Sequence, residues 1–153
     1  MDIKNEIMEA IEKVSEILGN RLTSNEIEII DRGCPHDQPK NLPNGCAAVY
    51  SFIYKEKFLK IGKANKKSQA RFVSQHYGLK APSTLAKSIC EDKQMQVLSV
   101  NAENVKEWLL KNTRRIDILI KCKNSEWATD LIEAIMHYKY VPRYEGKTKH
   151  NEE

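Results

Sequence analysis

The stretch AVYSFIYKEKFLKIGKANKKSQARFVSQHYG, residues 48–78, carries a tyrosine, several lysines, an arginine and a histidine around two short apolar runs. A phosphodiester is hydrolysed when a water loses a proton and cations neutralise the phosphate and the leaving oxygen. Tyr50 could take that proton if neighbouring cations lower the pKa of its phenol from the usual value of about 10. Lys63 and the planar guanidinium of Arg71 could bind phosphate oxygens. This stretch is therefore a candidate site for phosphate chemistry.

The elements that would position these side chains follow from local patterns. Apolar and aromatic residues predict a β-hairpin over residues 47–62, followed by a helix over 66–78 that Gly78 closes. On an ideal helix His76 lies about 140° around the axis from Arg71. His76 therefore reaches the same site only if the helix ends or tightens near Gly78.

The C-terminal half predicts a strand over residues 114–122 and a last helix over 126–140. That helix carries a polar stripe, which by itself would be a solvated face, opposite an apolar stripe. The polar stripe consists of Glu126, Asp130, Glu133 and His137, and the apolar stripe of Trp127, Leu131, Ala134, Ile135 and Tyr138. Glu133 could hold one hard divalent cation through its carboxylate oxygens.

The N-terminal part predicts an amphipathic helix over residues 3–18, which Gly19 ends. Its apolar stripe must cover either the main domain or a second copy of the chain. Residues 25–33 could be helix or strand, and the proline-rich residues 34–45 predict an irregular connection.

Composition sets the class of protein. The 153 residues are 41% hydrophobic and 30% charged, which is typical of a soluble globular chain. No apolar run is long enough to span a membrane, and the N-terminus lacks the pattern of a signal peptide, so we expect a cytoplasmic protein. The net charge of +4 is compatible with a polyanionic partner, and lysines are concentrated in residues 55–67.

The four cysteines are far apart and form no CxxC pair, so we expect reduced thiols. Cys34, His36 and Cys46 could supply three zinc ligands. Their spacing fits no recognised zinc module and no fourth ligand is evident. We therefore expect two small thiols and a loop histidine rather than a zinc site.

Taken in order, VYSFIY, LKIGKA, ARFVSQHY and the distant LIEAIMHYKYVPRYEG resemble the GIY-YIG nuclease superfamily, including bacterial GIY-YIG-type proteins of unassigned role. The two tripeptides that name the family correspond to Ala48-Val49-Tyr50 and Lys60-Ile61-Gly62. The resemblance covers about residues 46–146. Lys60 stands where many members have an active-site tyrosine, and Ala48 stands in place of the first glycine.

The resemblance implies a small, mainly antiparallel three-stranded sheet flanked by helices, an α/β (α+β) fold, with Mg²⁺ or Mn²⁺ as the cofactor. It implies the division 1–32, an N-terminal helical extension; 33–147, a GIY-YIG-like nuclease domain; and 148–153, a polar tail. The catalytic residues would be Tyr50, Lys63, Arg71, His76 and Glu133, with Glu133 holding the metal. Lys60, Lys66, Lys67 and Arg143 would contact nucleic acid, DNA before RNA.

Two functional hypotheses follow. The first is a metal-dependent endonuclease that hydrolyses DNA phosphodiester bonds, with tyrosine-assisted attack of water. The second, suggested by Lys60, is a catalytically inactive module of the same fold that binds nucleic acid or a protein partner. In either case the N-terminal helix is the candidate element for a homodimer or a partner contact.

Overall fold

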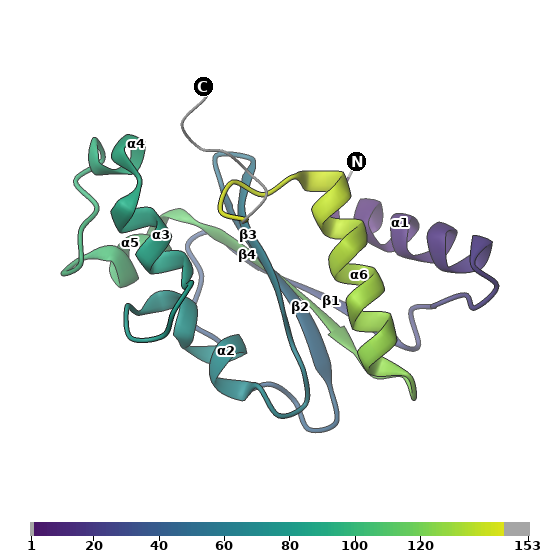
Figure 1. The fold of residues 1–153 in the computed structure, drawn as a ribbon. Coiled ribbons are helices and arrows are strands. Elements are labelled where there is room, and N and C mark those ends of the chain that lie inside the picture. Colours follow the sequence, from purple (N-terminus) through teal and green to yellow (C-terminus); the bar gives the residue numbers. More distant parts are fainter. Residues whose placement is uncertain (1, 146–153) are drawn as a thin grey trace.

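The computed structural model describes residues 2–145 (Figure 1). Eleven elements follow one another along this part of the chain: α1 (Ile3–Ile17), β1 (Ile27–Gly33), β2 (Ala47–Tyr54), β3 (Lys57–Ala64), α2 (Gln69–Val73), a 3-10 turn η1 (Gln75–Tyr77), α3 (Leu85–Glu91), α4 (Lys93–Gln96), α5 (Val105–Asn112), β4 (Arg114–Ile120) and α6 (Ser125–Tyr140). The predicted polar tail, 148–153, and the end of the predicted main domain lie outside the described residues.

The four strands form one antiparallel sheet in the order β1-β4-β2-β3. The prediction of a three-stranded sheet was wrong, because β1 adds a fourth strand. It pairs with β4, and Ile27 at its start lies opposite Ile120. Its residues read equally as helix or strand, and only the partner strand, more than eighty residues away, decides between the two. The mixed α/β class with helices flanking the sheet is confirmed.

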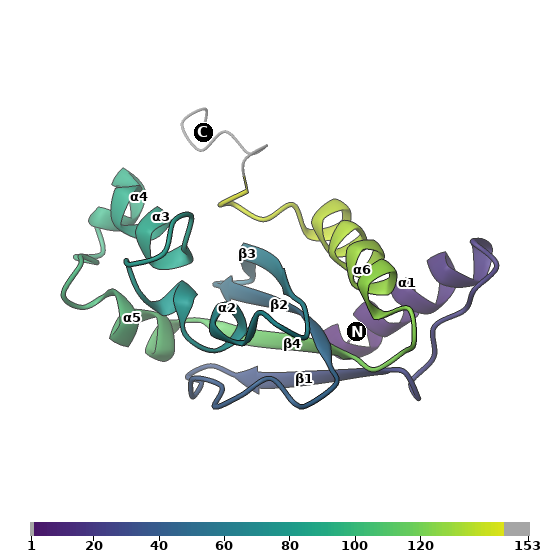
Figure 2. The same cartoon turned by 60° about the horizontal axis from the view of Figure 1, so that its bottom comes forward.

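Helices cover both faces of the sheet (Figure 2). On one face, α1 and α6 pack against a cluster that contains Ile7, Ile11, Ile132 and Met136. On the other face, α2, η1, α3 and α5 enclose a second cluster around Phe52. Alternation along β2 explains the division, because successive side chains of a strand point to opposite faces. None of the helices in the described part of the chain is both long and apolar enough to span a membrane.

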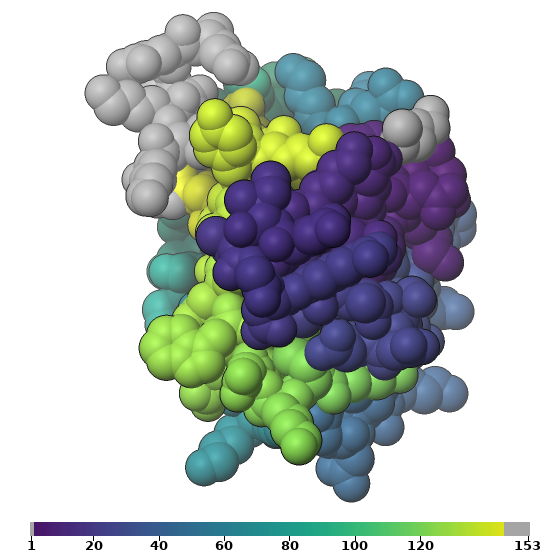
Figure 3. All heavy atoms as spheres, turned by 90° about the vertical axis from the view of Figure 1, so that its right-hand side faces the viewer, coloured from purple at the N-terminus to yellow at the C-terminus, as the bar shows by residue number. Residues whose placement is uncertain are grey.

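Helix α1 covers the main domain, which is one of the two alternatives that its sequence left open. Its buried side chains lie against β1 and α6, and Figure 3 shows the helix beside the light green residues of α6. Ile17 is 84% exposed and Leu18 is also exposed. A homodimer or partner contact through this end of the helix stays a prediction.

Helix α6 buries a different face from the one that its most apolar stripe indicated. Trp127 is 77% exposed and Tyr138 is 92% exposed, whereas Ala128, Ile132 and Met136 face the sheet. The polar stripe is also not simply solvated, since Glu133 is half-buried beside β3. The predicted apolar stripe was wrong because it was centred on the large aromatic side chains of this helix, whereas its smaller apolar side chains make the contact with the sheet.

Candidate active site

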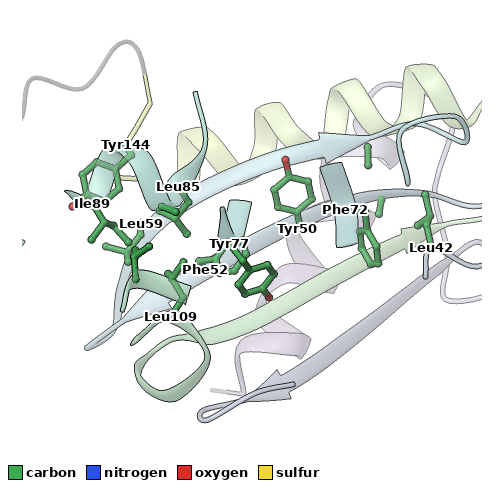
Figure 4. Packing of buried hydrophobic residues seen from close by; sticks show 14 of the residues in the cluster. Leu42, Tyr50, Phe52, Leu59, Phe72, Tyr77, Leu85, Ile89, Leu109 and Tyr144 are labelled. Carbon is green, nitrogen blue, oxygen red and sulfur yellow. The ribbon is translucent and has the colours of Figure 1, made fainter. Parts of the chain in front are cut away.

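Tyr50 reaches the free edge of the sheet by passing across the backbone of Gly62. The two residues are opposite each other in the pairing of β2 with the edge strand β3. A Cβ atom at position 62 would lie 2.4 Å from the Tyr50 hydroxyl oxygen, so only glycine leaves room for the ring. In Figure 4 the Tyr50 hydroxyl points towards this edge, away from the rings of Phe52 and Tyr77. The second glycine of the family-like pattern thus has a steric role.

His76 holds the Tyr50 hydroxyl from the opposite side. The helix predicted over 66–78 breaks into α2 and η1, which confirms the condition under which His76 can reach the site. The Leu85 N–H donates to His76 Nδ1 over 3.0 Å, so the neutral ring carries its proton on Nε2. That Nε2–H donates to the Tyr50 oxygen over 2.6 Å. Tyr50 is therefore left with its own proton to donate elsewhere.

The pKa values of this pair differ from the sequence expectation. Burial raises the pKa of Tyr50 to about 12, although the positive charge of Arg71 opposes the rise. Burial also lowers the pKa of His76 to about 3. Both groups are neutral near pH 7, and the expected lowering of the Tyr50 pKa by cations is not found. The reason is that Tyr50 is 0% exposed, and desolvation of the phenolate outweighs the nearby cations.

Arg71 approaches the same edge from α2. Among residues 2–145 no carboxylate lies within 4.0 Å of its guanidinium. Its positive charge acts on the Tyr50 hydroxyl and on His76, and its side chain lines an open pocket next to Gly62. An arginine without an acidic partner at the mouth of a pocket is suited to bind an anion.

Lys63 and Glu133 face each other across the gap between β3 and α6. Lys63 Nζ donates to Asp130 over 2.6 Å, and its distance to Glu133 Oε1 is 4.0 Å. The Asp130 hydrogen bond raises the pKa of Lys63. Burial raises the pKa of Glu133, although the charges of His137 and Lys63 oppose the rise. The positive charge of Lys63 is therefore compensated by Asp130. The oxygens of the Glu133 carboxylate remain available to accept from a ligand or to bind a cation.

The Glu133 carboxylate fits the single-carboxylate kind of site that Mg²⁺ uses. This ion commonly takes one or two protein carboxylates and fills its remaining positions with water. Within residues 2–145, Glu133 accepts no hydrogen bond, and its half-buried side chain opens into the pocket. No group of three or more His, Cys, Asp or Glu residues in that part of the chain could hold an ion. The donor set is thus compatible with one hard cation that remains largely hydrated.

The pocket between α2, the β3 edge and the start of α6 has a volume of about 1110 Å³. Its basic side chains are Lys60, Lys63, Lys66, Lys67, Arg71, Lys123 and His137, and its acidic side chains are Glu126, Asp130, Glu133 and Glu145. Three of the residues expected to contact nucleic acid, Lys60, Lys66 and Lys67, are therefore brought together. Lys60 is more engaged than the other two, because its Nζ donates to the Tyr144 carbonyl over 3.3 Å and pairs with Glu145.

Arg143, the fourth residue expected to contact nucleic acid, lies away from the pocket. Its Nε donates to Asp92 over 2.8 Å and its guanidinium also donates to Gln94. Its backbone N–H donates to the Phe58 carbonyl. Arg143 thus fixes the segment after α6 to the α3–α4 corner and to β3.

Cys34, His36 and Cys46 do not converge on a shared point for zinc. Both ring nitrogens of His36 are used, since Nδ1 donates to the Thr113 carbonyl over 2.7 Å and Nε2 accepts from Tyr77 over 2.8 Å. The Cys34 thiol is exposed, whereas Cys46 is in the core.

Sequence reasoning missed a buried charged network beneath the site. Arg115, only 1% exposed, donates to Asp117 over 2.9 Å and to the Tyr77 hydroxyl over 3.0 Å. It also donates to the Phe72 carbonyl over 2.7 Å, which ties it to the helix that carries Arg71. The sequence did contain a sign of this network. Arg115 and Asp117 are two residues apart in the apolar segment RRIDILI, so on a strand both side chains lie on the same face of β4.

Comparisons with protein-family models, with curated proteins and with solved structures found no significant match to this chain. The candidate site is therefore defined by its own residues and their geometry.

Proposed function

We propose that this protein is a metal-dependent endonuclease of the GIY-YIG type that hydrolyses nucleic-acid phosphodiester bonds, DNA before RNA. One observation carries the proposal. Arg71 from α2, Tyr50 from β2 and Glu133 from α6 approach the same stretch of the β3 edge at Gly62, and the charges of both Arg71 and Glu133 act on the Tyr50 hydroxyl.

The residues have separate roles in this proposal. Arg71 binds two oxygens of the scissile phosphate, and Lys66 and Lys67 bind flanking phosphates without reading sequence. Tyr50 would first lose its own proton to solvent, and the phenolate, which His76 Nε2–H stabilises, would then accept a proton from the attacking water. A divalent ion held by Glu133 would supply positive charge that favours the phenolate and offsets the charge developing on the phosphate and leaving oxygen.

The second candidate is binding without cleavage, and a specific observation favours it. Tyr50 is fully buried and neutral, and Lys63 is paired with Asp130. In that case the basic pocket would hold a nucleic acid or an acidic protein partner and perform no chemistry.

The test is cleavage of supercoiled plasmid and of a branched DNA by the full chain with Mg²⁺ or Mn²⁺. We expect Tyr50→Phe to slow cleavage by about 100-fold or more, the usual scale for a proton-transfer group. Glu133→Gln removes the carboxylate that would hold the metal ion and should slow cleavage at least as much. The matched controls are Tyr138→Phe and Glu126→Gln, which alter exposed side chains and should retain the wild-type rate. DNA binding that survives in Tyr50→Phe and Glu133→Gln, with no cleavage under either metal, would instead support the binding module.

A further inference from the structure

The Glu145 carboxylate occupies a position between two basic side chains at one end of the pocket. Its Oε1 lies 3.4 Å from Lys60 Nζ and 3.6 Å from His137 Nε2. This oxygen is buried, and within residues 2–145 it has no hydrogen-bond partner. The Lys60–Glu145 contact is therefore an ion pair without a hydrogen bond, which another anion can replace.

The segment after α6 holds Glu145 in this position. The Arg143 N–H donates to the Phe58 carbonyl and the Tyr144 N–H to the Leu59 carbonyl, each over 2.9 Å. The Tyr144 hydroxyl donates to Asp92 over 2.7 Å. The segment is thus attached along the free edge of β3, and Glu145 is the residue that projects towards Lys60.

Lys60 and Glu145 also separate two hollows. Both residues line the 1110 Å³ pocket that contains Arg71, and both line a second hollow of about 440 Å³. The second hollow adds Lys87, one acidic residue, Glu91, and the uncharged Ser83, Ser88 and Tyr144. The first hollow contains Arg71, the second contains Lys87, and Lys60 lines both of them next to Glu145. This sequence of cations suits a strand that carries a negative charge at every nucleotide.

We propose that Lys60 forms a second phosphate subsite, in which the Glu145 carboxylate takes the place of a backbone phosphate until a nucleic-acid strand displaces it. His137 lines this subsite without donating to the phosphate, because its Nε2–H already donates to the Ile61 carbonyl over 3.1 Å. The strand then runs from Arg71 past Lys60 towards Lys87. The inference rests on the proposed function only for the class of ligand, because the subsite concerns binding and needs no cleavage. The sequence already made Lys60 a candidate nucleic-acid contact, and the subsite adds that Glu145 occupies its phosphate position in the free protein.

The test measures binding of a fluorescently labelled 12-nucleotide oligothymidine by anisotropy, in EDTA and over a series of salt concentrations. We expect Glu145→Gln to bind about tenfold more tightly than wild type at low salt and to add about 0.7 to the magnitude of the salt slope, the value for one extra phosphate contact on a single strand. Lys60→Met in the Glu145→Gln background should return both quantities to the wild-type values.

The matched control is Glu126→Gln, which removes one negative charge from the wall of the same pocket but does not face Lys60. It should leave the salt slope unchanged. Equal changes in Glu145→Gln and Glu126→Gln would overturn the subsite, as would a gain that persists without Lys60, or no oligonucleotide binding by wild type and Glu145→Gln alike. Thermal unfolding of each variant confirms that the comparison is between folded proteins, and Glu145→Ala provides a second removal of the carboxylate.

The outcome is independent of the nuclease assay. Tighter binding by Glu145→Gln with no cleavage under any metal would support the subsite and reject the endonuclease. Cleavage that depends on Tyr50 and Glu133, with no change of binding in Glu145→Gln, would reject the subsite alone.

Discussion

Two arginines lie near Tyr50 in different surroundings: Arg115 is buried and paired with a carboxylate, whereas Arg71 lines the open pocket at Gly62. Beneath the sheet surface, Arg115 is bound by Asp117, Tyr77 and the Phe72 carbonyl, and Arg32 gives Asp117 a second cation. At the open edge, Arg71 has no carboxylate partner within the described chain. A buried arginine with a hydrogen-bond partner for each of its three guanidinium nitrogens stabilises a fold, whereas an arginine in a pocket without a carboxylate partner is available to a ligand.

Tyr50 lies at the boundary between these regions. Its ring packs within the core near Arg115, and its hydroxyl is within reach of the charge of Arg71. His76 belongs to the same boundary, because it links the Tyr50 hydroxyl to the N–H of Leu85. Changes on the inner side should therefore alter mainly stability, and changes on the outer side mainly binding.

The largest effect is expected for Arg115→Met. Removing this guanidinium leaves Asp117 buried with only Arg32 as a partner, and breaking a buried pair in this way costs about 3–5 kcal/mol. Urea unfolding followed by circular dichroism measures the loss. Arg71→Met is the matched substitution on the outer side. A loss for Arg115→Met no greater than that for Arg71→Met would contradict the distinction between the two regions.

The next effect is a pH dependence of stability that His76 causes. Its pKa is about 3 in the folded protein and the ordinary value of a histidine is about 6.5, so between these values the unfolded chain binds the extra proton. The contribution of neutral His76 to the free energy of unfolding is fully present above about pH 6.5. It falls by up to about 1.4 kcal/mol per pH unit as the pH decreases towards 3. Urea titrations from pH 7 to pH 4 should give a shallower slope for His76→Asn than for wild type. Equal slopes would show that His76 is not held neutral.

Gly62→Ala should have a smaller but distinct effect. The added methyl group would overlap the Tyr50 hydroxyl end, and overpacking of this kind costs about 1–3 kcal/mol. Shortening the partner in Tyr50→Leu should remove most of that cost, so the double variant should be more stable than the sum of the two single losses predicts. Strict additivity of the two losses, measured by urea unfolding, would contradict the close approach of the ring to Gly62.

The smallest effect on stability, within about 0.5 kcal/mol, is expected for Arg71→Met, because within residues 2–145 its guanidinium has no carboxylate partner and the Tyr50 hydroxyl that it contacts is also bound by His76. The same substitution should weaken DNA binding uniformly across sequences and reduce the salt slope by about 1. Anisotropy titrations with two duplexes of unrelated sequence test this. A change of affinity for one duplex only would contradict a role in backbone binding.

Much of the fold follows from local patterns. The first and last helices, the hairpin and the strand at 114–120 are present close to where periodicity placed them. Strand β1 could not be assigned, since IEII suits either a helix or a strand and its partner β4 is distant in the sequence. The buried side of α6 was also misjudged, because Trp127 and Tyr138 carry the most apolar surface in that helix yet face solvent.

For the site, the family-like pattern singled out Tyr50, Lys63, Arg71, His76 and Glu133 as candidates, and the fold brings these side chains together near Gly62 at one edge of the sheet. A catalytic role for them stays a prediction. The electrostatic state of the site could not be read from the sequence. The raised pKa of Tyr50 results from burial beneath Gly62, and the position of Glu145 results from pairing of its segment with β3. Both depend on contacts between residues that are distant in the chain.

The most direct test of the central claim is a crystal structure of the full chain with Mn²⁺ and a non-hydrolysable phosphorothioate oligonucleotide. Anomalous scattering locates the ion without ambiguity. We expect one Mn²⁺ on the Glu133 carboxylate, with a backbone phosphate bound between that ion and the Arg71 guanidinium, next to Gly62. An ion bound elsewhere, or a phosphate that contacts neither Arg71 nor the ion, would contradict this expectation.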